Sequence, residues 1–444
     1  VMPMASASCR LARRLATNLV RCPGRFAATE AEVPRPRLIM TPRTNPAKGG
    51  DTRVSKQMPW IFRNEVANVE DLRSNSNGSS LLVDVQTNKG RELGIAMCNL
   101  TKGGAIGVNI FGRMLTENVA MNIDVDFFKA RVSRALEHRR RCGLEDGYRL
   151  VNGEGDLLPG VLCDRYGDVL CLQFTALAAE ELMREEILDA LEAVLSPQAI
   201  VLRYDAREDR QLEQASIKMP EVARGQVSGR LECSTSSGFV FTADPLAQGW
   251  TTGAFFAESA LRNLLDLSMT AHARGQLHRG SAPRKDGKHK GPKPALPKPP
   301  QVLSLFGESS GVFAAWKGAK VTCAIHSQAK DACEALELLA TRNECGDITY
   351  CTLGEEPKFE ELGSQCKGQF DIVTLEPAAL APTYGKLEEG ARLYTAWSAF
   401  AATACRPGGL LLVACRSRTM SPVRLLRCIN LGIWSAGLRG RLVH

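Results

Sequence analysis

Three common signals are missing from this 444-residue chain. It has no run of eighteen or more apolar residues, so we expect no membrane-spanning helix. Its fifteen cysteines form no CxxC pair and no CxxxH spacing, which argues against a zinc module, and we predict no metal site. Scattered cysteines in a chain of this length are also unlike a small secreted disulfide scaffold, so we expect a reducing compartment. The remaining composition, 44% hydrophobic and 23% charged, is that of a globular protein with two or three domains.

Acidic residues are missing from the first 29 residues, which carry five arginines. This segment is rich in Ala and Ser, and Leu11, Leu15 and Leu19 recur every four residues. The pattern is typical of an organellar targeting peptide, and the alternative is a disordered basic tail. Because Arg dominates, we predict a mitochondrial location, with plastid or cytoplasm as alternatives. We interpret residues 1–52 as targeting peptide and linker, since the part after residue 29 is rich in Pro and Gly.

A second basic segment lies at residues 270–300. Within it, residues 272–300 carry eight Lys or Arg against Asp286, a net charge of +7 (8 − 1). The first 29 residues contribute +5, so the rest of the chain has a charge near −4 (8 − 5 − 7). The segment has almost no large apolar residue, so it cannot offset its chain entropy and we predict a disordered insertion. It either adds salt-sensitive attraction to nucleic acid or is a tolerated surface loop.

The patterns predict three folded units between and around these segments. Residues 53–122 contain short alternating apolar runs separated by Gly- and Asn-rich turns, which indicates a small all-β module of hairpins. Residues 123–235 contain a linker helix followed by β-α-β order, which indicates a mixed α/β domain. In residues 236–444 strands alternate with helices, which is typical of a doubly wound parallel sheet. The predicted fold class is therefore α/β with an N-terminal β module.

The linker helix, residues 124–142, has one apolar face and one face whose charges are almost all positive. A charged face is usually only solvated, but a one-signed basic face also suits the phosphates of RNA. The candidate RNA contacts on it are Arg131, Arg134, Arg139 and Arg140.

Small residues follow the first strand of the C-terminal unit, in the turn GESSG at 307–311. Small residues there let a cofactor approach the N-terminus of the next helix. The turn is not a dinucleotide GxGxxG pattern, so the cofactor need not be NAD. The segments FDIVTLEPA (370–378) and CRPGGLLLVACRS (405–417) follow at the distances expected for later strands of one sheet.

Together these C-terminal segments resemble a class I S-adenosylmethionine-dependent methyltransferase. MPWIFRNEV (58–66) looks like the opening of a PUA-type RNA-binding module. LPGVLCDRYGD (158–168) is similar to LPGLxxDRYGD, a signature of the bacterial large-subunit rRNA cytosine-5 methyltransferase family. TTGAFFAESALR (251–262) resembles that family's KTGFFLDQRxNR, and LFGESSGVFAAWKGAKVT (305–322) resembles its LFxYTGGFxxxAxxxGAxxV. The resemblance spans 58–425 in the right order.

The resemblance implies a PUA-like β-barrel, a central α/β domain and a Rossmann-like methyltransferase domain. It implies methyl transfer from S-adenosyl-L-methionine to C5 of a cytosine in RNA, with rRNA as the expected partner and a homodimer as a candidate assembly. In such a reaction a cysteine thiolate adds to C6, and a base later removes the C5 proton. The implied residues are Cys415 and Glu376 for catalysis, Phe306, Gly307, Ser309, Gly311, His326, Glu376 and Pro377 for the cofactor, and Trp60 for RNA.

Several positions depart from the family's pattern. Ser304 stands where the first strand has aspartate, and His326 replaces the acid that binds the ribose. Glu376 begins the turn that the family builds from DPP, and Arg416 stands where its SCS motif has the nucleophile, one residue after Cys415. Three interpretations stay open: an rRNA cytosine-5 methyltransferase, a methyltransferase of another base or atom, and a catalytically impaired RNA-binding protein of organellar ribosome assembly or structure.

Four acids crowd the stretch NGEGDLLPGVLCDRYGD, residues 152–168. Paired acids near glycines can form a catalytic site, but Asp and Gly also serve the backbone geometry of turns. We therefore interpret Glu154, Asp156, Asp164 and Asp168 as turn formers.

Overall fold

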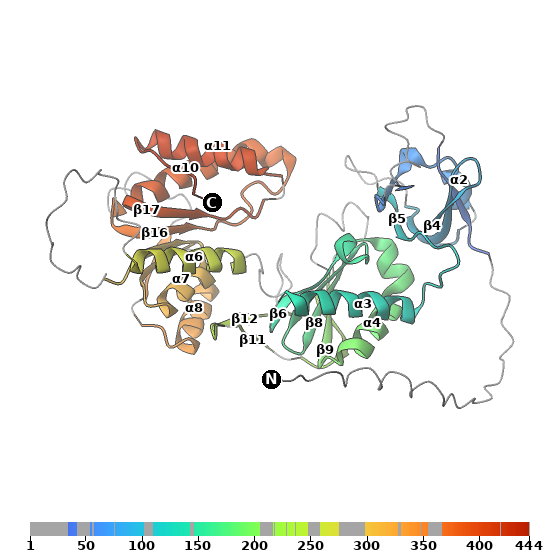
Figure 1. Ribbon diagram of the computed structural model, residues 1–444, viewed down its shortest axis with the longest axis horizontal. Helices are drawn as coiled ribbons and strands as arrows, with labels where there is room; N and C mark the ends of the chain where they lie inside the picture. Colours follow the sequence, from blue (N-terminus) through green and yellow to red (C-terminus); the bar gives the residue numbers. More distant parts are fainter. Residues whose placement is uncertain are drawn as a thin grey trace, which may run out of the picture.

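The computed structural model describes residues 34–41, 54–55, 57–74, 76–101, 110–142, 146–204, 216, 218–227, 229–235, 237–246, 258–274, 298–326, 330–346, 348–353, 366–417 and 419–443. The predicted targeting peptide, most of the linker, the start of TTGAFFAESALR and most of the basic insertion lie outside the described residues. Figure 1 shows the described elements as an N-terminal unit (blue), a central unit (green) and a C-terminal unit (yellow to red).

The N-terminal unit is a five-stranded sheet with strand order β1-β3-β4-β5-β2. The antiparallel pairing of β3, β4 and β5 agrees with the alternating apolar pattern of the sequence. Strand β1 pairs in parallel with β3. Since β1 lies inside 1–52, interpreting that whole segment as targeting peptide and linker needs correction. The elements are β1 (Arg37–Ile39), β2 (Trp60–Phe62), η1 (Arg63–Glu65), α2 (Val69–Ser74), β3 (Ser80–Gln86), β4 (Glu92–Asn99) and β5 (Ile110–Thr116).

The central unit is a five-stranded sheet with strand order β10-β9-β8-β7-β6, covered by two helices. Only β8 and β9 pair in parallel, because α4 connects them as a crossover helix. Helix α3 begins where the side chain of Asp124 accepts a hydrogen bond from the backbone N–H of Phe127. The elements are α3 (Val125–Arg141), β6 (Gly147–Asn152), η2 (Gly153–Asp156), β7 (Val161–Tyr166), β8 (Val169–Phe174), α4 (Leu177–Leu195), β9 (Ala199–Arg203) and β10 (Glu221–Gly225).

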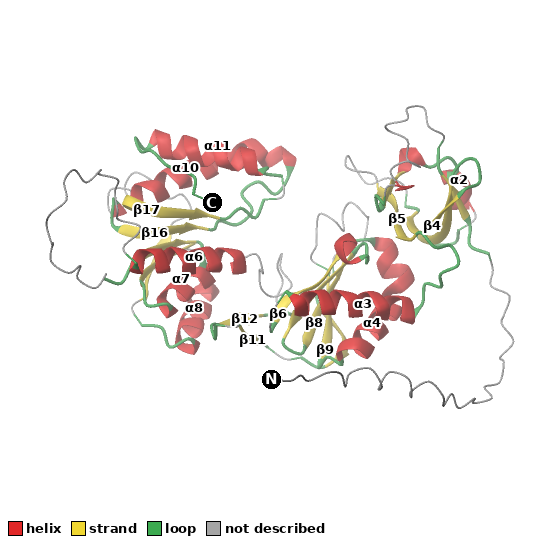
Figure 2. Cartoon of the chain, viewed as in Figure 1, coloured by secondary structure: helices red, strands yellow, loops and turns green. Residues whose placement is uncertain are grey.

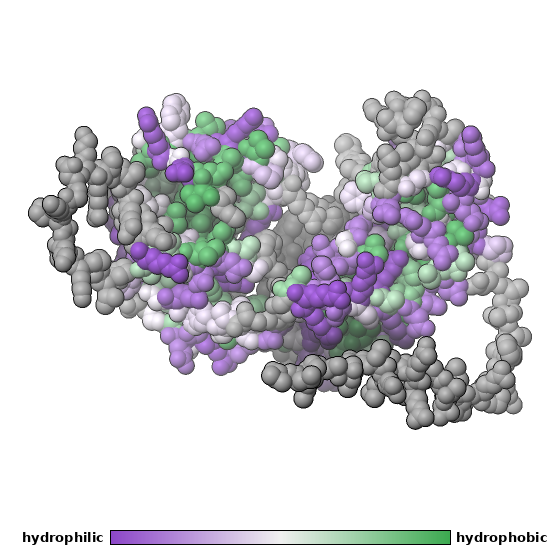
Figure 3. All heavy atoms as spheres, in the orientation of Figure 1, coloured by the Kyte–Doolittle hydropathy of each residue, from purple (hydrophilic) through white to green (hydrophobic). Residues whose placement is uncertain are grey.

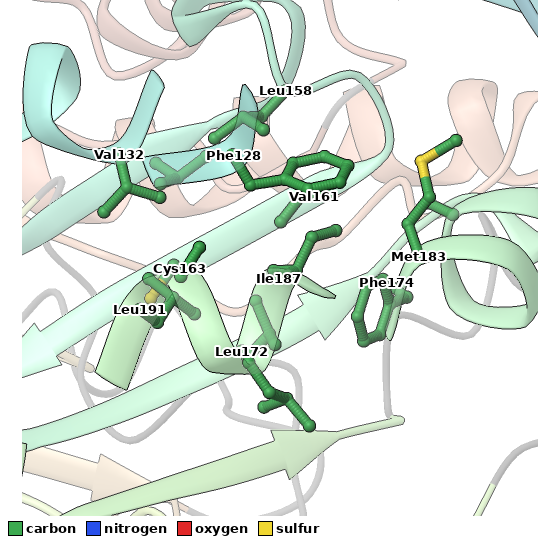
Figure 4. Close-up of a cluster of buried hydrophobic side chains, with 14 of the residues drawn as sticks. Phe128, Val132, Leu158, Val161, Cys163, Leu172, Phe174, Met183, Ile187 and Leu191 are labelled. Carbon is green, nitrogen blue, oxygen red and sulfur yellow. The ribbon is translucent and has the colours of Figure 1, made fainter. Parts of the chain in front are cut away.

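A hydrophobic core lies between these two helices and the central sheet (Figure 4). Phe128 of α3 and Ile187 of α4 pack over Leu172 of β8, and each such buried side chain contributes about 1.5–3 kcal/mol. Met97 and Leu115, from the N-terminal sheet, belong to the same cluster. The first two units therefore share part of one core.

The C-terminal unit contains five parallel strands in the order β15-β14-β13-β16-β17, which confirms the predicted parallel sheet. Helices α6, α7 and α8 lie on one face of the sheet, and α10 and α11 lie on the other (Figures 1 and 2). The elements are α6 (Glu258–Ala273), β13 (Gln301–Leu305), α7 (Glu308–Trp316), β14 (Lys320–His326), α8 (Lys330–Arg342), β15 (Ile348–Leu353), β16 (Phe370–Leu375), η3 (Tyr384–Lys386), α10 (Leu387–Ala404), β17 (Cys405–Val413) and α11 (Pro422–Ser435).

A small hairpin, β11 (Leu231–Ser234) with β12 (Val240–Ala243), connects the central and C-terminal units. The side chain of Asn343 accepts from the backbone N–H of Val240 and donates to its carbonyl, both at 2.8 Å, which fastens the hairpin to the end of α8. Within the described ranges, every helix is too short or too polar to cross a membrane. The same residues contain no cluster of His, Cys, Asp and Glu suited to a metal ion.

Candidate cofactor site at the carboxyl edge of the parallel sheet

The strand order of the C-terminal sheet reverses between β13 and β16. At such a point the connections leave toward opposite faces of the sheet, which opens a crevice at the carboxyl ends of the two strands. Here the backbone N–H of Glu376 donates to the carbonyl of Leu305 at 2.9 Å and ties the two strand ends together. The turn GESSG and the turn Glu376-Pro377, which follow these two strand ends, therefore lie side by side, as the resemblance implies.

The turn after β13 is held by buried polar groups. Phe306 has a φ of 60°, which lets the chain reverse sharply before Gly307, the residue that caps α7. The hydroxyl of Ser304 donates to the carbonyl of Gly307 at 2.7 Å, and the hydroxyl of Thr374 donates to Ser304 at 3.2 Å. Ser304, which stands where the family pattern has aspartate, thus fixes the turn from inside.

Two glycines are required by close packing around this turn. A Cβ on Gly307 would lie 2.0 Å from a carboxylate oxygen of Glu376 and 2.8 Å from the hydroxyl of Ser304. A Cβ on Gly311 would lie 2.4 Å from the sulfur of Cys323 on β14. Gly307 therefore lets the buried carboxylate of Glu376 reach the first turn of α7, and Gly311 lets α7 pack directly on the sheet.

Arg262 of α6 is a site residue that the sequence analysis did not select. Its guanidinium donates to the hydroxyl of Ser309 at 2.9 Å, in the first turn of α7, and its side chain is buried beside the rings of Phe239 and Phe241. A signal was present, because Arg262 is the last residue of TTGAFFAESALR and matches the final arginine of the family's pattern. Arg262 links α6 and β12 to the cofactor turn.

Cys415 follows β17 and packs into a small apolar cluster with Tyr394 and Cys428, on the α10 and α11 side of the sheet. Burial and a hydrogen bond to Cys415 raise the pKa of Tyr394 well above its usual value, so this phenol is a donor and not a base at neutral pH. Its oxygen also lies 3.4 Å from the hydroxyl of Ser417. The other cofactor candidate, His326, is the last residue of β14 at the same edge of the sheet.

Two of the predicted RNA contacts on α3 have structural roles. Arg139 forms a two-pronged ion pair with Asp156, both N–O distances being 2.6 Å, and donates to the carbonyl of Arg149. Arg131 donates to the carbonyls of Leu157 and Leu115. Through these contacts both guanidinium groups hold α3 against its neighbours, and their part in RNA binding stays a prediction.

The remaining predicted RNA contacts differ from one another. Arg134 and Arg140 are exposed on α3, and their role in RNA binding stays a prediction. Trp60 is 36% exposed and its ring N–H donates to a carboxylate oxygen of Glu154 at 2.8 Å. Trp60 therefore joins the N-terminal sheet to the central unit through η2.

The four acids of residues 152–168 do not all form turns. Asp164 lies within β7, is 1% exposed and is paired with Arg149 at 2.5 and 3.0 Å, so interpreting it as a turn former is wrong. Glu154 and Asp156 stand in η2. Asp168 and Gly167, which has a φ of 59°, form the two-residue β7–β8 turn, as predicted for Asp168. Three of the acids therefore fix neighbouring elements: Glu154 accepts from Trp60, Asp156 pairs with Arg139, and Asp164 pairs with Arg149.

Comparisons with known proteins show what the chain is similar to. No protein-family model matches the chain. It is 25% identical to ribosomal RNA large subunit methyltransferase I of Cronobacter sakazakii over 82% of this chain and 83% of that protein. It is 24% identical to a ribosomal RNA large subunit methyltransferase of Deinococcus radiodurans over 94% of this chain and 93% of that protein. The chain is similar to rRNA large subunit methyltransferases.

Solved structures support the same fold. A methyltransferase complexed with SAH superposes with a TM-score of 0.65 at 16% identity, covering 90% of each chain. A protein assigned as a SAM-dependent methyltransferase from Streptococcus mutans superposes with a TM-score of 0.64, also at 16% identity and 90% coverage of each chain. The mixed α/β fold therefore extends over nearly the whole of both chains, as predicted.

Proposed function

We propose that this chain is an S-adenosylmethionine-dependent methyltransferase that acts on rRNA, with C5 of a cytosine as the methyl acceptor. The observation that carries the proposal is the similarity to rRNA large subunit methyltransferases over 82–94% of the chain, which includes the two turns joined at β13 and β16. Support for the cytosine comes from the motifs at 158–168 and 305–322.

The residues at the carboxyl edge fit this cofactor. S-adenosylmethionine carries a positive sulfonium and a positive ammonium group, and Glu376 supplies a buried carboxylate in contact with the cofactor turn. The backbone N–H groups in the first turn of α7 suit the cofactor's own carboxylate. Phe306, Gly307, Ser309 and Gly311 would hold this end of the cofactor, and His326 would face its ribose. When bound, the cofactor supplies an electrophilic methyl group.

The remaining steps fall to the chain's own residues. In the proposed reaction Cys415 gives its thiol proton to a base and adds to C6 of the cytosine, which makes C5 nucleophilic. After C5 has gained the methyl group, a base removes the C5 proton and the bond between sulfur and C6 breaks. Tyr394 would hold the sulfur of Cys415 by a hydrogen bond, and Glu376 is the candidate base at the sheet edge.

The PUA-like assignment of the N-terminal sheet, the homodimer and the mitochondrial location belong to the same proposal. The small five-stranded N-terminal sheet suits a module that positions RNA, and Trp60 and Glu154 would fix its orientation relative to the central unit. The expected location can be checked by imaging the full chain with and without residues 1–29.

Two measurements test the proposal. Calorimetry should detect S-adenosylmethionine binding to the full chain, and labelled methyl groups should appear in large-subunit rRNA as 5-methylcytosine. Cys415→Ala should abolish the 5-methylcytosine, whereas Cys428→Ala, which removes a neighbouring buried thiol of the same cluster, should not. Methylation of a different atom after Cys415→Ala would refute the cytosine-5 assignment. Absence of cofactor binding at millimolar concentration would refute the enzyme and favour an RNA-binding protein without catalysis.

A further inference from the structure

The last forty residues form a third basic segment. Residues 405–444 contain seven arginines and no Lys, Asp or Glu, a net charge of +7. More than half of this segment lies in β17 and α11. The arginines within these two elements, Arg406, Arg424 and Arg427, are therefore held in fixed positions on the C-terminal unit.

Helix α11 exposes one face that combines apolar, aromatic and basic side chains. Its inner face packs Cys428 and Gly432 against α10. The outer face presents Val423, Leu431 and Trp434, which are 64%, 56% and 76% exposed. Figure 3 shows apolar side chains gathered on the C-terminal unit between α11 and the sheet. We use the name α11 face for the exposed residues Val423, Arg427, Leu431 and Trp434 of α11, together with Leu438, Arg439 and Arg441 of the segment that follows it.

The arginines of the α11 face differ from those of α3. On α3, Arg139 and Arg141 pair with carboxylates of the chain. On the α11 face, Arg427, Arg439 and Arg441 are exposed and, among the residues described, none of the three pairs with a carboxylate. Their charges are therefore available to an external anion.

An exposed tryptophan beside unpaired arginines matches the chemistry of RNA. Single strands bind to grooves and faces where arginines contact the phosphates and aromatic rings stack on the bases. A second copy of this chain is a poorer occupant, because two α11 faces would bring their arginines together with no acid between them. The observed charge thus selects a polyanion.

The direction of α11 connects this face to the site. Helix α11 follows the loop 414–421, which leaves the carboxyl edge of the sheet just after β17. It runs beside α10 in the same direction, because Arg424 pairs with Glu388 at their starts and Gly432 contacts Thr395 farther along both. A strand bound along the α11 face therefore leads to the edge where β13 and β16 end.

We propose that the α11 face is an RNA-binding surface, on which Trp434 stacks with a base and Arg427, Arg439 and Arg441 contact the phosphates. The inference rests on the proposed function only in taking rRNA as the bound RNA. It requires neither the cofactor nor methyl transfer. It adds a contact within the methyltransferase unit to the predicted contacts of the N-terminal and central units.

The test compares two double variants of the full chain that lose the same charge. Arg427→Gln with Arg439→Gln removes two arginines of the α11 face, and Lys320→Gln with Lys367→Gln removes two exposed lysines elsewhere on the same unit. Affinity for a fluorescent single-stranded rRNA fragment is measured by anisotropy at several salt concentrations. The arginine variant should lower the slope of log affinity against log salt by about 1.4, twice the ~0.7 of one single-strand phosphate contact, and the lysine variant should not.

Trp434 supplies an independent test. Trp434→Ala should weaken binding about tenfold, as loss of one base stack does, while Trp434→Phe should keep most of the affinity. Equal effects of the arginine and lysine variants, or unchanged affinity of Trp434→Ala, would overturn the proposal. A dimer in sedimentation that Leu431→Asp dissociates without changing RNA affinity would assign the face to a second copy instead. Calorimetry with S-adenosylmethionine is run on every variant, so that a failed cofactor site is recognised separately.

Discussion

The substitution Gly307→Ala tests whether the contact between Glu376 and the first turn of α7 builds the cofactor site. The new Cβ would lie 2.0 Å from the Glu376 carboxylate oxygen, 2.6 Å from its Cδ and 2.8 Å from the Ser304 hydroxyl. Ordinary contact begins near 3.4 Å, so the oxygen has to move by 1.4 Å (3.4 − 2.0). Because Glu376 and Ser304 are each 1% exposed, this movement displaces packed neighbours.

The expected effect is an overpacked turn. Overpacking costs about 1–3 kcal/mol, and in a unit of this size each kcal/mol lowers the melting temperature by about 2–4 °C. We therefore expect Gly307→Ala to lower the calorimetric melting temperature by about 2–12 °C and to weaken S-adenosylmethionine binding at least tenfold, about 1.4 kcal/mol. The second loss follows because the carboxylate is pushed from the place where the cofactor is proposed to meet it.

A matched control and a rescue make the test specific. Gly346→Ala adds the same methyl group in the same unit, at a place where no atom lies within 4 Å of the new Cβ. It should change neither the melting temperature nor the affinity for S-adenosylmethionine. Glu376→Asp shortens the acid by one methylene, so it should restore part of the stability and affinity in the Gly307→Ala background. If Gly307→Ala behaves like Gly346→Ala, or if Glu376→Asp restores nothing, the contact does not shape the site.

Two further predictions concern the rest of the chain. Arg139→Met leaves the nearly buried Asp156 without its partner and should lower the free energy of unfolding in urea by about 3 kcal/mol. Arg140→Met, on the exposed face of α3, should change this free energy by less than about 0.5 kcal/mol. Equal losses in the two variants would contradict the structural role of Arg139. The hydrogen bond from Tyr204 lowers the pKa of Glu221 below its ordinary value of 4.5, so its contribution to stability is present above pH 4.5 and is lost as the pH falls through the lowered pKa. Urea midpoints measured from pH 6 to 3 should therefore fall less steeply in Tyr204→Phe than in the unchanged protein. Parallel curves for the two proteins would contradict the assignment.

The C-terminal sheet was predictable because its central strands β13 and β16 are apolar and buried, and because its strands alternate with helices. The strands expected within 370–378 and 405–417 are β16 and β17. The edge strand β15, ITYCTL, was missed, because its mixed polar and apolar residues lack the continuous apolar run of a central strand. Helix α11 was not predicted.

The polar contacts were less predictable. Asp164 stands next to Arg165, Tyr166 and Gly167 in the sequence, which favours a turn, but the strand continues through it because Arg149 of the neighbouring strand neutralises its charge. The basic face of α3 suggested RNA, but Asp156 lies seventeen residues away in the sequence and reaches Arg139 only after β6 has formed. Pairing between distant residues is set by topology, which a helical spacing does not contain.

The departures at the cofactor site make sense in pairs. Ser304 is shorter than the aspartate of the family pattern, and its hydroxyl turns back to the carbonyl of Gly307. Glu376 is longer than the aspartate of DPP, and its carboxylate fills the space beside the same glycine. One strand thus has a hydroxyl where the family pattern has a carboxylate, and the neighbouring strand end carries a longer carboxylate toward the shared turn. Such complementary changes keep an acid at the carboxyl edge, and for this reason we favour a working cofactor site over a decayed one.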